Sequence, residues 1–173
     1  MTTRLFWPIW LLASVTTGLV AGFMLGHALI LGRFLDWMLT SDPHLLATTY
    51  PAFARSAGST GLTLFYAICG LQIIAAPALL ALALGARRHR LGAGVAAITA
   101  VAWPVLHYAS GFGAVEAVAL RSATAVSGDV ATRFLAWNLP VHAGHAGLLL
   151  VGLVALLAIP LSAARRTAAA GER

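Results

Sequence analysis

The sequence predicts an all-α fold, a bundle of four transmembrane helices with a short extra helix in the first outer loop. Of its 173 residues, 60% are hydrophobic and only 9% are charged, and the mean hydropathy is +0.89. A water-soluble globular domain carries about 25% charged residues. The composition therefore argues against a soluble enzyme, a disordered chain and a nucleic-acid-binding protein. The single cysteine, Cys69, excludes an internal disulfide and a metal site built from several cysteines.

Four apolar segments are long enough to cross a bilayer, which takes roughly 20 apolar residues. We expect one integral membrane domain over residues 1–173, with spans at about 5–31, 61–86, 94–115 and 134–164. The first segment is longer than the roughly 7–15 apolar residues of a signal peptide, so we interpret it as a retained helix.

The arginines indicate how such a bundle is oriented. With the N-terminus inside, seven arginines and one acid, Glu172, fall in the inner segments, whereas four arginines and four acids fall in the outer ones. Positive charge collects on the cytoplasmic side of membrane proteins. We therefore expect an integral membrane protein, as in a bacterial inner membrane, with both termini in the cytoplasm.

The first helix carries a regular series of small residues. Gly18, Gly22 and Gly26 recur every four residues and form a smooth stripe. Such a stripe allows two helices to approach closely. We expect it to pack against another helix within the monomer, with a dimer contact as the less favoured alternative.

The first outer loop contains a helix-start signal. In Ser41-Asp42-Pro43, a capping side chain precedes a proline at the first helical position. A short loop helix is expected from His44 to about Tyr50, with Pro51 ending or bending it.

Four of the six histidines lie inside apolar segments, where ionisable side chains are costly and mark candidate functional sites. At a rise of about 1.5 Å per residue, they lie roughly 8–16 Å from the outer ends of their helices, and Gln72 on the second helix lies at a similar depth. Polar groups from all four helices therefore collect in the outer half of the bundle. The four histidines are His27, His107, His142 and His145.

Helical spacing places these polar groups on single helix faces. On the fourth span, Asn138, His142 and His145 follow the spacing i, i+4, i+7. The third span shows the same spacing for Trp103, His107 and Ser110.

One acid near the third span has two interpretations. Glu116 falls about half a turn from the His107 face if the helix is unbroken at about 3.6 residues per turn. A bend at Gly111 and Gly113 would bring it back toward His107, whereas a rim position would allow it to pair with Arg121.

Such a histidine cluster supports several kinds of chemistry. Neutral imidazole is the commonest metal ligand, and the cluster suits iron, copper or zinc. A b-type haem held by histidines from two helices is a second option, and general-base catalysis without a metal is a third. The remaining interpretation is that the histidines only hydrogen-bond between helices.

We assign candidate roles within the cluster. The candidate metal ligands are His27, His107, His142 and His145, and the candidate catalytic residues are His107 and His142. The residues expected to contact a cofactor or line the pocket are His27, Gln72, Trp103, Trp137 and Asn138.

The fourth span opens with the pattern Arg-Phe-x-x-Trp-Asn, which is formed here by Arg133, Phe134, Trp137 and Asn138. With the glycine-rich first helix and the loop helix, this pattern resembles the anthrone oxygenase-like family of small membrane proteins. The resemblance implies a four-helix membrane bundle and, in some members, oxidation of an anthrone to an anthraquinone by O2. It also implies that Trp137 and Asn138 line a pocket. Many members have an arginine about where this chain has His142, so the pair of His142 and His145 departs from the family pattern.

Two functions follow from these observations. The first is a membrane-embedded, oxygenase-like oxidoreductase whose histidine-lined pocket binds copper, iron or haem and a lipophilic aromatic substrate. The alternative is a non-catalytic subunit of a larger membrane complex, or a protein that binds a lipid, quinone or pigment. The expected partners are the lipid bilayer, a lipophilic small molecule, and a larger complex or a second copy of the chain, with no nucleic acid.

Overall fold

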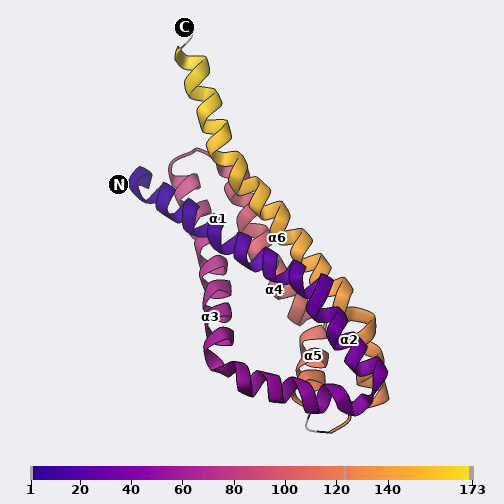
Figure 1. Ribbon diagram of the computed structural model, residues 1–173. Coiled ribbons are helices and arrows are strands. Elements are labelled where there is room, and N and C mark those ends of the chain that lie inside the picture. The colour runs from indigo at the N-terminus through magenta and orange to yellow at the C-terminus, as the bar shows by residue number, and fades with distance from the viewer. Residues whose placement is uncertain (1, 123, 172–173) are drawn as a thin grey trace. The chain divides into compact units, whose positions relative to one another are not determined.

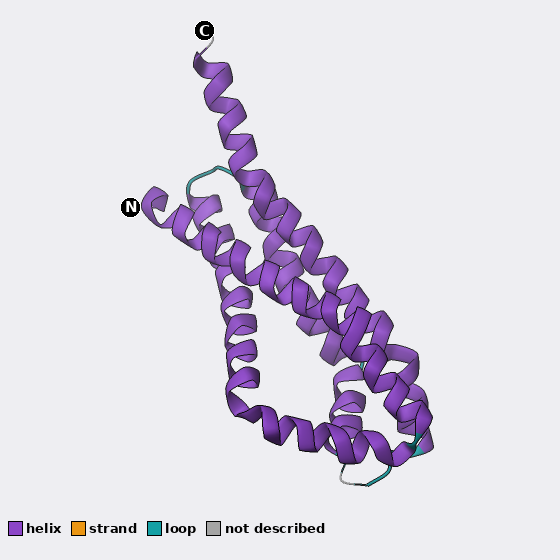
Figure 2. Ribbon diagram, viewed as in Figure 1, coloured by secondary structure: helices purple, strands orange, loops and turns teal. Residues whose placement is uncertain are grey.

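A computed structural model describes residues 2–122 and 124–171, and every regular element in this part of the chain is a helix (Figures 1 and 2). Glu172 and Arg173, which enter the predicted charge balance, lie outside the described residues. In chain order the elements are α1 (Thr2–Gly26), η1 (His27–Leu31), α2 (Gly32–Ser41), α3 (Pro43–Gly85), α4 (Arg90–Ala109), α5 (Phe112–Arg121) and α6 (Gly128–Gly171).

The described chain contains four helical stretches long and apolar enough to cross a membrane. Only 28% to 39% of the most apolar window of each stretch is buried within the protein. The large apolar side chains that face outward, such as Ile30, Ile74 and Ile98, need lipid or a partner to cover them. These features are consistent with an integral membrane protein. The four stretches are Arg4–Ser41, Thr60–Gly85, Arg90–Ala109 and Gly128–Ala164.

Three of the four stretches differ from the predicted boundaries. The fourth was expected to begin near residue 134 but begins at Gly128. The first was expected to end near residue 31, but α1, η1 and α2 form an uninterrupted helical run to Ser41, since the backbone stays helical through Leu31 and Gly32. The third was expected to run to residue 115, but α4 ends at Ala109 and α5 begins at Phe112. Gly111 causes this break, because its φ of +78° is a left-handed conformation that glycine adopts without strain.

The start of the loop helix was predicted correctly, but its end was not. Asp42 has an extended backbone, and its Oδ1 accepts a hydrogen bond of 2.9 Å from the backbone N–H of His44, as a capping residue does. The helix that follows does not end at Pro51. It continues as α3 for 43 residues, because a proline removes only one backbone hydrogen bond and the neighbouring bonds remain. The extra helix is therefore not a separate element.

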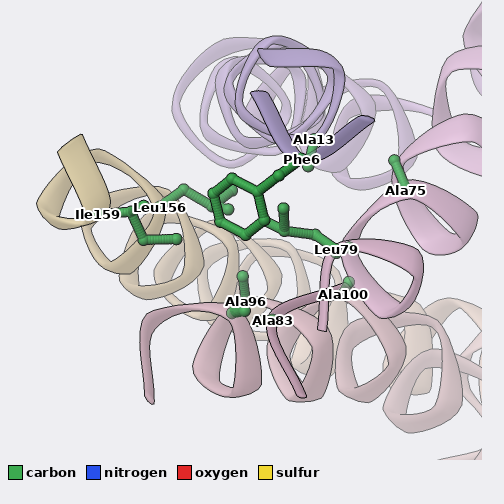
Figure 3. Close-up of a cluster of buried hydrophobic side chains, with 11 residues drawn as sticks. Phe6, Ala13, Ala75, Leu79, Ala83, Ala96, Ala100, Leu156 and Ile159 are labelled. Atoms are coloured by element: carbon green, nitrogen blue, oxygen red, sulfur yellow. The ribbon is translucent and has the colours of Figure 1, made fainter. Parts of the chain in front are cut away.

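The chain divides into two compact units. The first unit contains the chain up to Ala21, Ile68–Ala102 and the chain from Gly147 on, and the second contains Gly22–Ala67 and Trp103–Ala146. The core of the first unit is mostly alanine, packed around Phe6 and three larger aliphatic side chains (Figure 3). Small side chains let helix backbones approach closely. The aliphatic side chains are Leu79, Leu156 and Ile159.

The second unit has a bulkier core, and this unit carries all four of the intramembrane histidines. Phe112 of α5 and Phe134 of α6 pack in it, with ring centroids 6.1 Å apart, beside Leu35 and Met38 of α2. This core holds α2, α5 and α6 together around the polar residues of that unit.

The closest helix contacts involve glycines other than the predicted stripe. A Cβ on Gly92 would lie 2.9 Å from the Ala155 carbonyl oxygen, and a Cβ on Gly152 would overlap the Thr99 hydroxyl. By contrast, no described atom lies within 4 Å of the Cβ positions of Gly22 and Gly26. The prediction of close packing within the monomer is therefore wrong for these two glycines, because no described side chain or backbone of another helix approaches them. A Cβ on Gly18 would lie 3.9 Å from Leu153 Cδ2, which is an ordinary contact.

We expect Gly92→Ala to destabilise the protein by about 1–3 kcal/mol, because the new methyl group meets a backbone oxygen that cannot rotate away. Thermal unfolding in detergent would measure the loss. Gly22→Ala is the matched control and should leave the unfolding temperature unchanged or higher. Equal losses in both variants would contradict the packing described here.

Candidate metal centre

The second unit brings the four predicted histidines together. The rings of His27 and His142 are stacked, with centroids 3.6 Å apart and planes 17° apart. The ring of His145 lies 5.5 Å from that of His107 and 5.9 Å from that of His142. All but His107 are at most 6% exposed. The imidazoles therefore form one cluster rather than four separate contacts.

His27 is positioned by an irregular turn of its helix. It opens η1, a single π-helical turn, which is a rare feature that occurs frequently at functional sites. At the end of this turn, a Cβ on Gly32 would lie 2.9 Å from the His27 carbonyl oxygen and 2.9 Å from Leu139 Cδ2. A glycine at position 32 therefore allows the widened turn to pack against α6.

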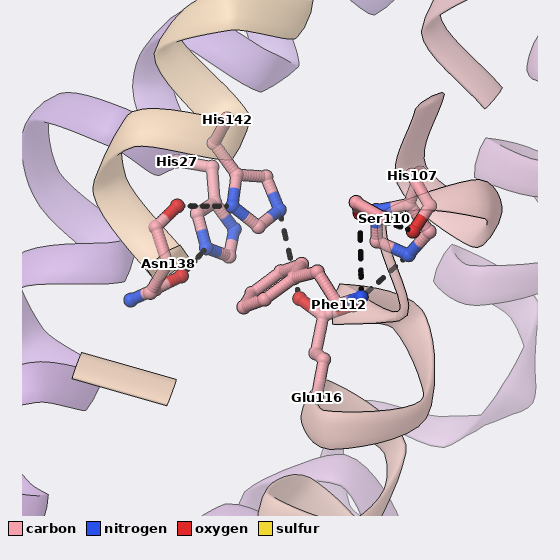
Figure 4. A network of polar contacts seen from close by, with 7 residues as sticks. All are labelled: His27, His107, Ser110, Phe112, Glu116, Asn138 and His142. Carbon is pink, nitrogen blue, oxygen red and sulfur yellow. Dashed lines mark hydrogen bonds and ion pairs between the residues drawn. The ribbon is translucent and has the colours of Figure 1, made fainter. Parts of the chain in front are cut away.

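Asn138 fixes the orientation of His27 (Figure 4). Its side-chain Nδ2 donates hydrogen bonds to the Gly32 carbonyl oxygen at 3.0 Å and to Asp36 Oδ1 at 2.8 Å. Because both partners are acceptors, the amide orientation is determined, and Oδ1 must face the Nε2 of His27, which lies 3.1 Å away. His27 therefore carries its proton on Nε2 and keeps a lone pair on Nδ1.

The backbone of Asn138 orients His142 in the same way. His142 Nδ1 lies 2.8 Å from the Asn138 carbonyl oxygen, which can only accept, so Nδ1 carries the proton. The lone pair of His142 is then on Nε2, which lies 3.5 Å from Glu116 Oε1. A histidine that donates one N–H to a carbonyl and presents the other nitrogen is the usual arrangement of a metal ligand.

Glu116 joins the cluster because the helix breaks at Gly111. The chain turns there, and Ser110 supports the turn by accepting the N–H of Phe112 and donating to the His107 carbonyl oxygen. As a result, Glu116 Oε2 lies 3.5 Å from His107 Nε2 (Figure 4). Of the two interpretations of Glu116, the bend at Gly111 is the one that the structure shows.

Burial makes Glu116 chemically unusual. Desolvation raises the pKa of its carboxyl group from 4.5 to about 7. Its oxygen and the lone pair of His142 face each other as two acceptors at 3.5 Å. Two acceptors at this distance repel unless a proton or a cation lies between them, so the arrangement suits either a protonated carboxyl group or a bound metal ion.

Three side chains lie close enough to hold one metal ion. One ligand atom from each of His27, His142 and Glu116 can be chosen so that all three lie within 4.8 Å of one another. Two histidines and one carboxylate are the ligand set of many non-haem iron enzymes. The sequence analysis did not predict Glu116 as a ligand. The two glycines after His107 did indicate where the helix could bend, and such a bend brings Glu116 to the cluster.

The other predicted site residues lie in different surroundings. Trp103 is buried and meets the His145 ring edge-on, with centroids 5.6 Å apart. Trp137 is 56% exposed and lines a cavity of about 290 Å³ together with Arg133 and Phe112. Phe112 also contacts the rings of His107 and His142, so one side chain of the cavity lining touches the histidine cluster. Gln72 is fully buried in the first unit, and its predicted role in the site stays a prediction.

No protein-family model matches the chain, and no curated protein or solved structure is significantly similar to it. The resemblance to the anthrone oxygenase-like family therefore stays a prediction.

We expect the Glu116 carboxyl group to be protonated at pH values below about 7 and ionised above, because burial raises its pKa to about 7. Infrared spectra of metal-free wild-type protein minus those of Glu116→Gln isolate the C=O stretch of this acid. That band should be strong about one pH unit below the pKa and weak about one unit above it. Loss of the band already near pH 4.5, the ordinary pKa, would show that the carboxyl group is solvated.

Proposed function

We propose that this protein is a four-helix membrane bundle that holds a transition-metal ion through His27, His142 and Glu116 and acts as an oxidoreductase. The observation that carries the proposal is the arrangement of three ligand atoms within 4.8 Å in an apolar unit. The positive-inside balance of the sequence supports an orientation with both termini in the cytoplasm.

The donor set favours iron, with copper as the second choice. Imidazole suits iron, copper and zinc, and a set of two histidines and one carboxylate with open positions is typical of iron(II) oxygenases. Two atoms that each lie about 2.1 Å from one ion at a tetrahedral angle are roughly 3.4 Å apart, close to the 3.5 Å between His142 Nε2 and Glu116 Oε1. A haem fits less well between His27 and His142, because their rings stack 3.6 Å apart with no space for a porphyrin.

The protein's own residues prepare the site for such an ion. Asn138 holds His27 and His142 in the tautomers that present lone pairs, which is the task of groups that orient metal ligands. His27 and His142 are at most 6% exposed, and this burial strengthens the electrostatic interactions between the residues of the site. A bound iron or copper ion would supply one-electron and O2 chemistry at this place.

The cavity beside Phe112 is a candidate binding place for a lipophilic aromatic substrate. It lies one ring away from His107 and His142, and Trp137 offers it an aromatic surface. The family resemblance suggests oxidation of a ring methylene to a ketone. In that reaction one atom of O2 becomes the carbonyl oxygen, and the other leaves as water with the two methylene hydrogens. The four electrons lost by carbon reduce one O2, so no other reductant is needed.

A non-catalytic role in lipid, quinone or pigment binding is the alternative. It is favoured by the second cavity, of about 510 Å³, which is lined by residues of the first unit. Its lining combines aliphatic residues of α4 and α6, such as Val95 and Ile159, with Arg90.

We expect wild-type protein purified from membranes to contain at least about one iron or copper ion per chain, and His142→Ala to contain less than about 0.1. His142 donates one of the three ligand atoms, and its loss leaves too few donors. Elemental analysis with an absorption spectrum measures both quantities. His44→Ala is the matched control, because its imidazole lies outside the cluster and is expected to leave metal content unchanged.

A wild-type protein with less than about 0.1 metal ion per chain would overturn the proposed centre. A Soret band would show that haem is bound instead.

We expect Asn138→Leu to weaken metal binding by about 10- to 100-fold, because His27 loses the acceptor that fixes its ring. Competition with a chromophoric chelator measures the affinity in the folded fraction recovered by size exclusion. Trp137→Phe is the control and should bind metal as the wild type does, since Trp137 is 56% exposed and is not one of the three proposed ligands. An unchanged affinity in Asn138→Leu would remove Asn138 from the support of the site.

A further inference from the structure

We propose that the cluster holds two metal ions and that Glu116 bridges them, with the second ion bound by His107 and His145. This inference rests on the proposed function, which places the first ion between His27, His142 and Glu116. It adds a second site, built from the two imidazoles that the first ion does not use.

The two oxygens of Glu116 point to different histidines. Oε1 lies 3.5 Å from His142 Nε2, and Oε2 lies 3.5 Å from His107 Nε2. Both distances are too long for a good hydrogen bond and close to the roughly 3.4 Å expected for two ligands of one tetrahedral ion. The carboxylate therefore offers one oxygen to each side, as a bridging ligand does.

His145 carries a ring nitrogen that lacks a partner. The side chain is 3% exposed, and its Nδ1 is buried with no hydrogen-bond partner among the described residues. A buried polar nitrogen without a partner costs on the order of 1–3 kcal/mol, so native proteins rarely keep one. Its neighbours are the rings of His107, His142 and Trp103. The proposed second ion, bound beside His107, is the partner that this nitrogen lacks.

The distances between the imidazole rings fit two neighbouring metal sites rather than one ion bound by all four histidines. The rings of His107 and His142 are 6.5 Å apart, whereas His107 and His145 are 5.5 Å apart and form a second pair. Two-metal centres place their ions about 3.5–4 Å apart, a separation that one carboxylate can bridge. Carboxylate-bridged metal pairs within four-helix bundles are known in soluble proteins.

Charge limits what the pair can take. Four neutral imidazoles and one carboxylate carry a single negative charge. A second carboxylate, Asp36, accepts a hydrogen bond from Asn138, and in the described part of the chain it makes no hydrogen bond to the imidazoles. Two divalent ions would leave positive charge that an oxygen anion, such as hydroxide, must balance. The site therefore suits iron, copper or another transition metal that accepts imidazole and keeps open positions for such a ligand.

The test is a count of Co²⁺ ions bound to metal-free protein in detergent, by titration and elemental analysis. We expect two ions per wild-type chain and one in His145→Ala. His107→Gln should likewise bind one ion, and it provides a second variant should His145→Ala fail to fold. His44→Ala, whose histidine lies outside the cluster, should still bind two.

The outcomes separate this inference from the proposed function. One ion in the wild type, unchanged in His145→Ala, overturns the second site and leaves the first. No ion in the wild type overturns both. If every variant binds two ions, the second ion is bound elsewhere, and the proposed bridging by Glu116 is also overturned. Magnetic coupling between the two Co²⁺ ions, read by electron paramagnetic resonance on the wild type alone, supports a shared carboxylate, and uncoupled ions contradict it.

Discussion

The polar centre of this protein depends on one amide, Asn138. Its Nδ2 bonds to two acceptors, the Gly32 carbonyl and Asp36, so its Oδ1 must receive a proton from His27. Its backbone oxygen receives the proton of His142. In an apolar environment no water competes for these groups, and each unpaired one would cost free energy. One residue thus decides where two of the four imidazoles carry their lone pairs.

Irregular backbone serves this arrangement. The π turn at His27 and the left-handed Gly111 both interrupt ordinary α-helix, and each lies next to a histidine of the cluster. Regular helices would place side chains only at their fixed spacing, which puts Glu116 half a turn away from His107. Departures from regular helix geometry occur frequently at functional sites. There the backbone conformation serves the placement of functional groups rather than the local hydrogen-bonding pattern.

The donor atoms of the second unit are unusual for the interior of an apolar helical protein. Buried carboxyl and imidazole groups inside apolar helices are costly, so a fold that gathers five of them in one unit needs a reason. Hydrogen bonds between helices account for Asn138, His27 and Asp36. A proton on Glu116 or a bound cation would account for the two acceptor atoms that face each other at 3.5 Å. A buried histidine nitrogen has no partner in the described part of the chain, and the proposed second ion would supply one.

The four apolar helices, the cap at Asp42 and the set of polar residues could be predicted without any tertiary information, because the spacing of apolar residues and local hydrogen bonds can be identified along the chain. The predicted third span ran across Gly111, and two positions remained open for Glu116. The contacts of Glu116 with His107 and His142 depend on the folded chain, since a single left-handed residue redirects every side chain after it. Tautomers and ring stacking were likewise beyond the sequence, because they depend on contacts between residues more than 100 positions apart, such as His27 and Asn138.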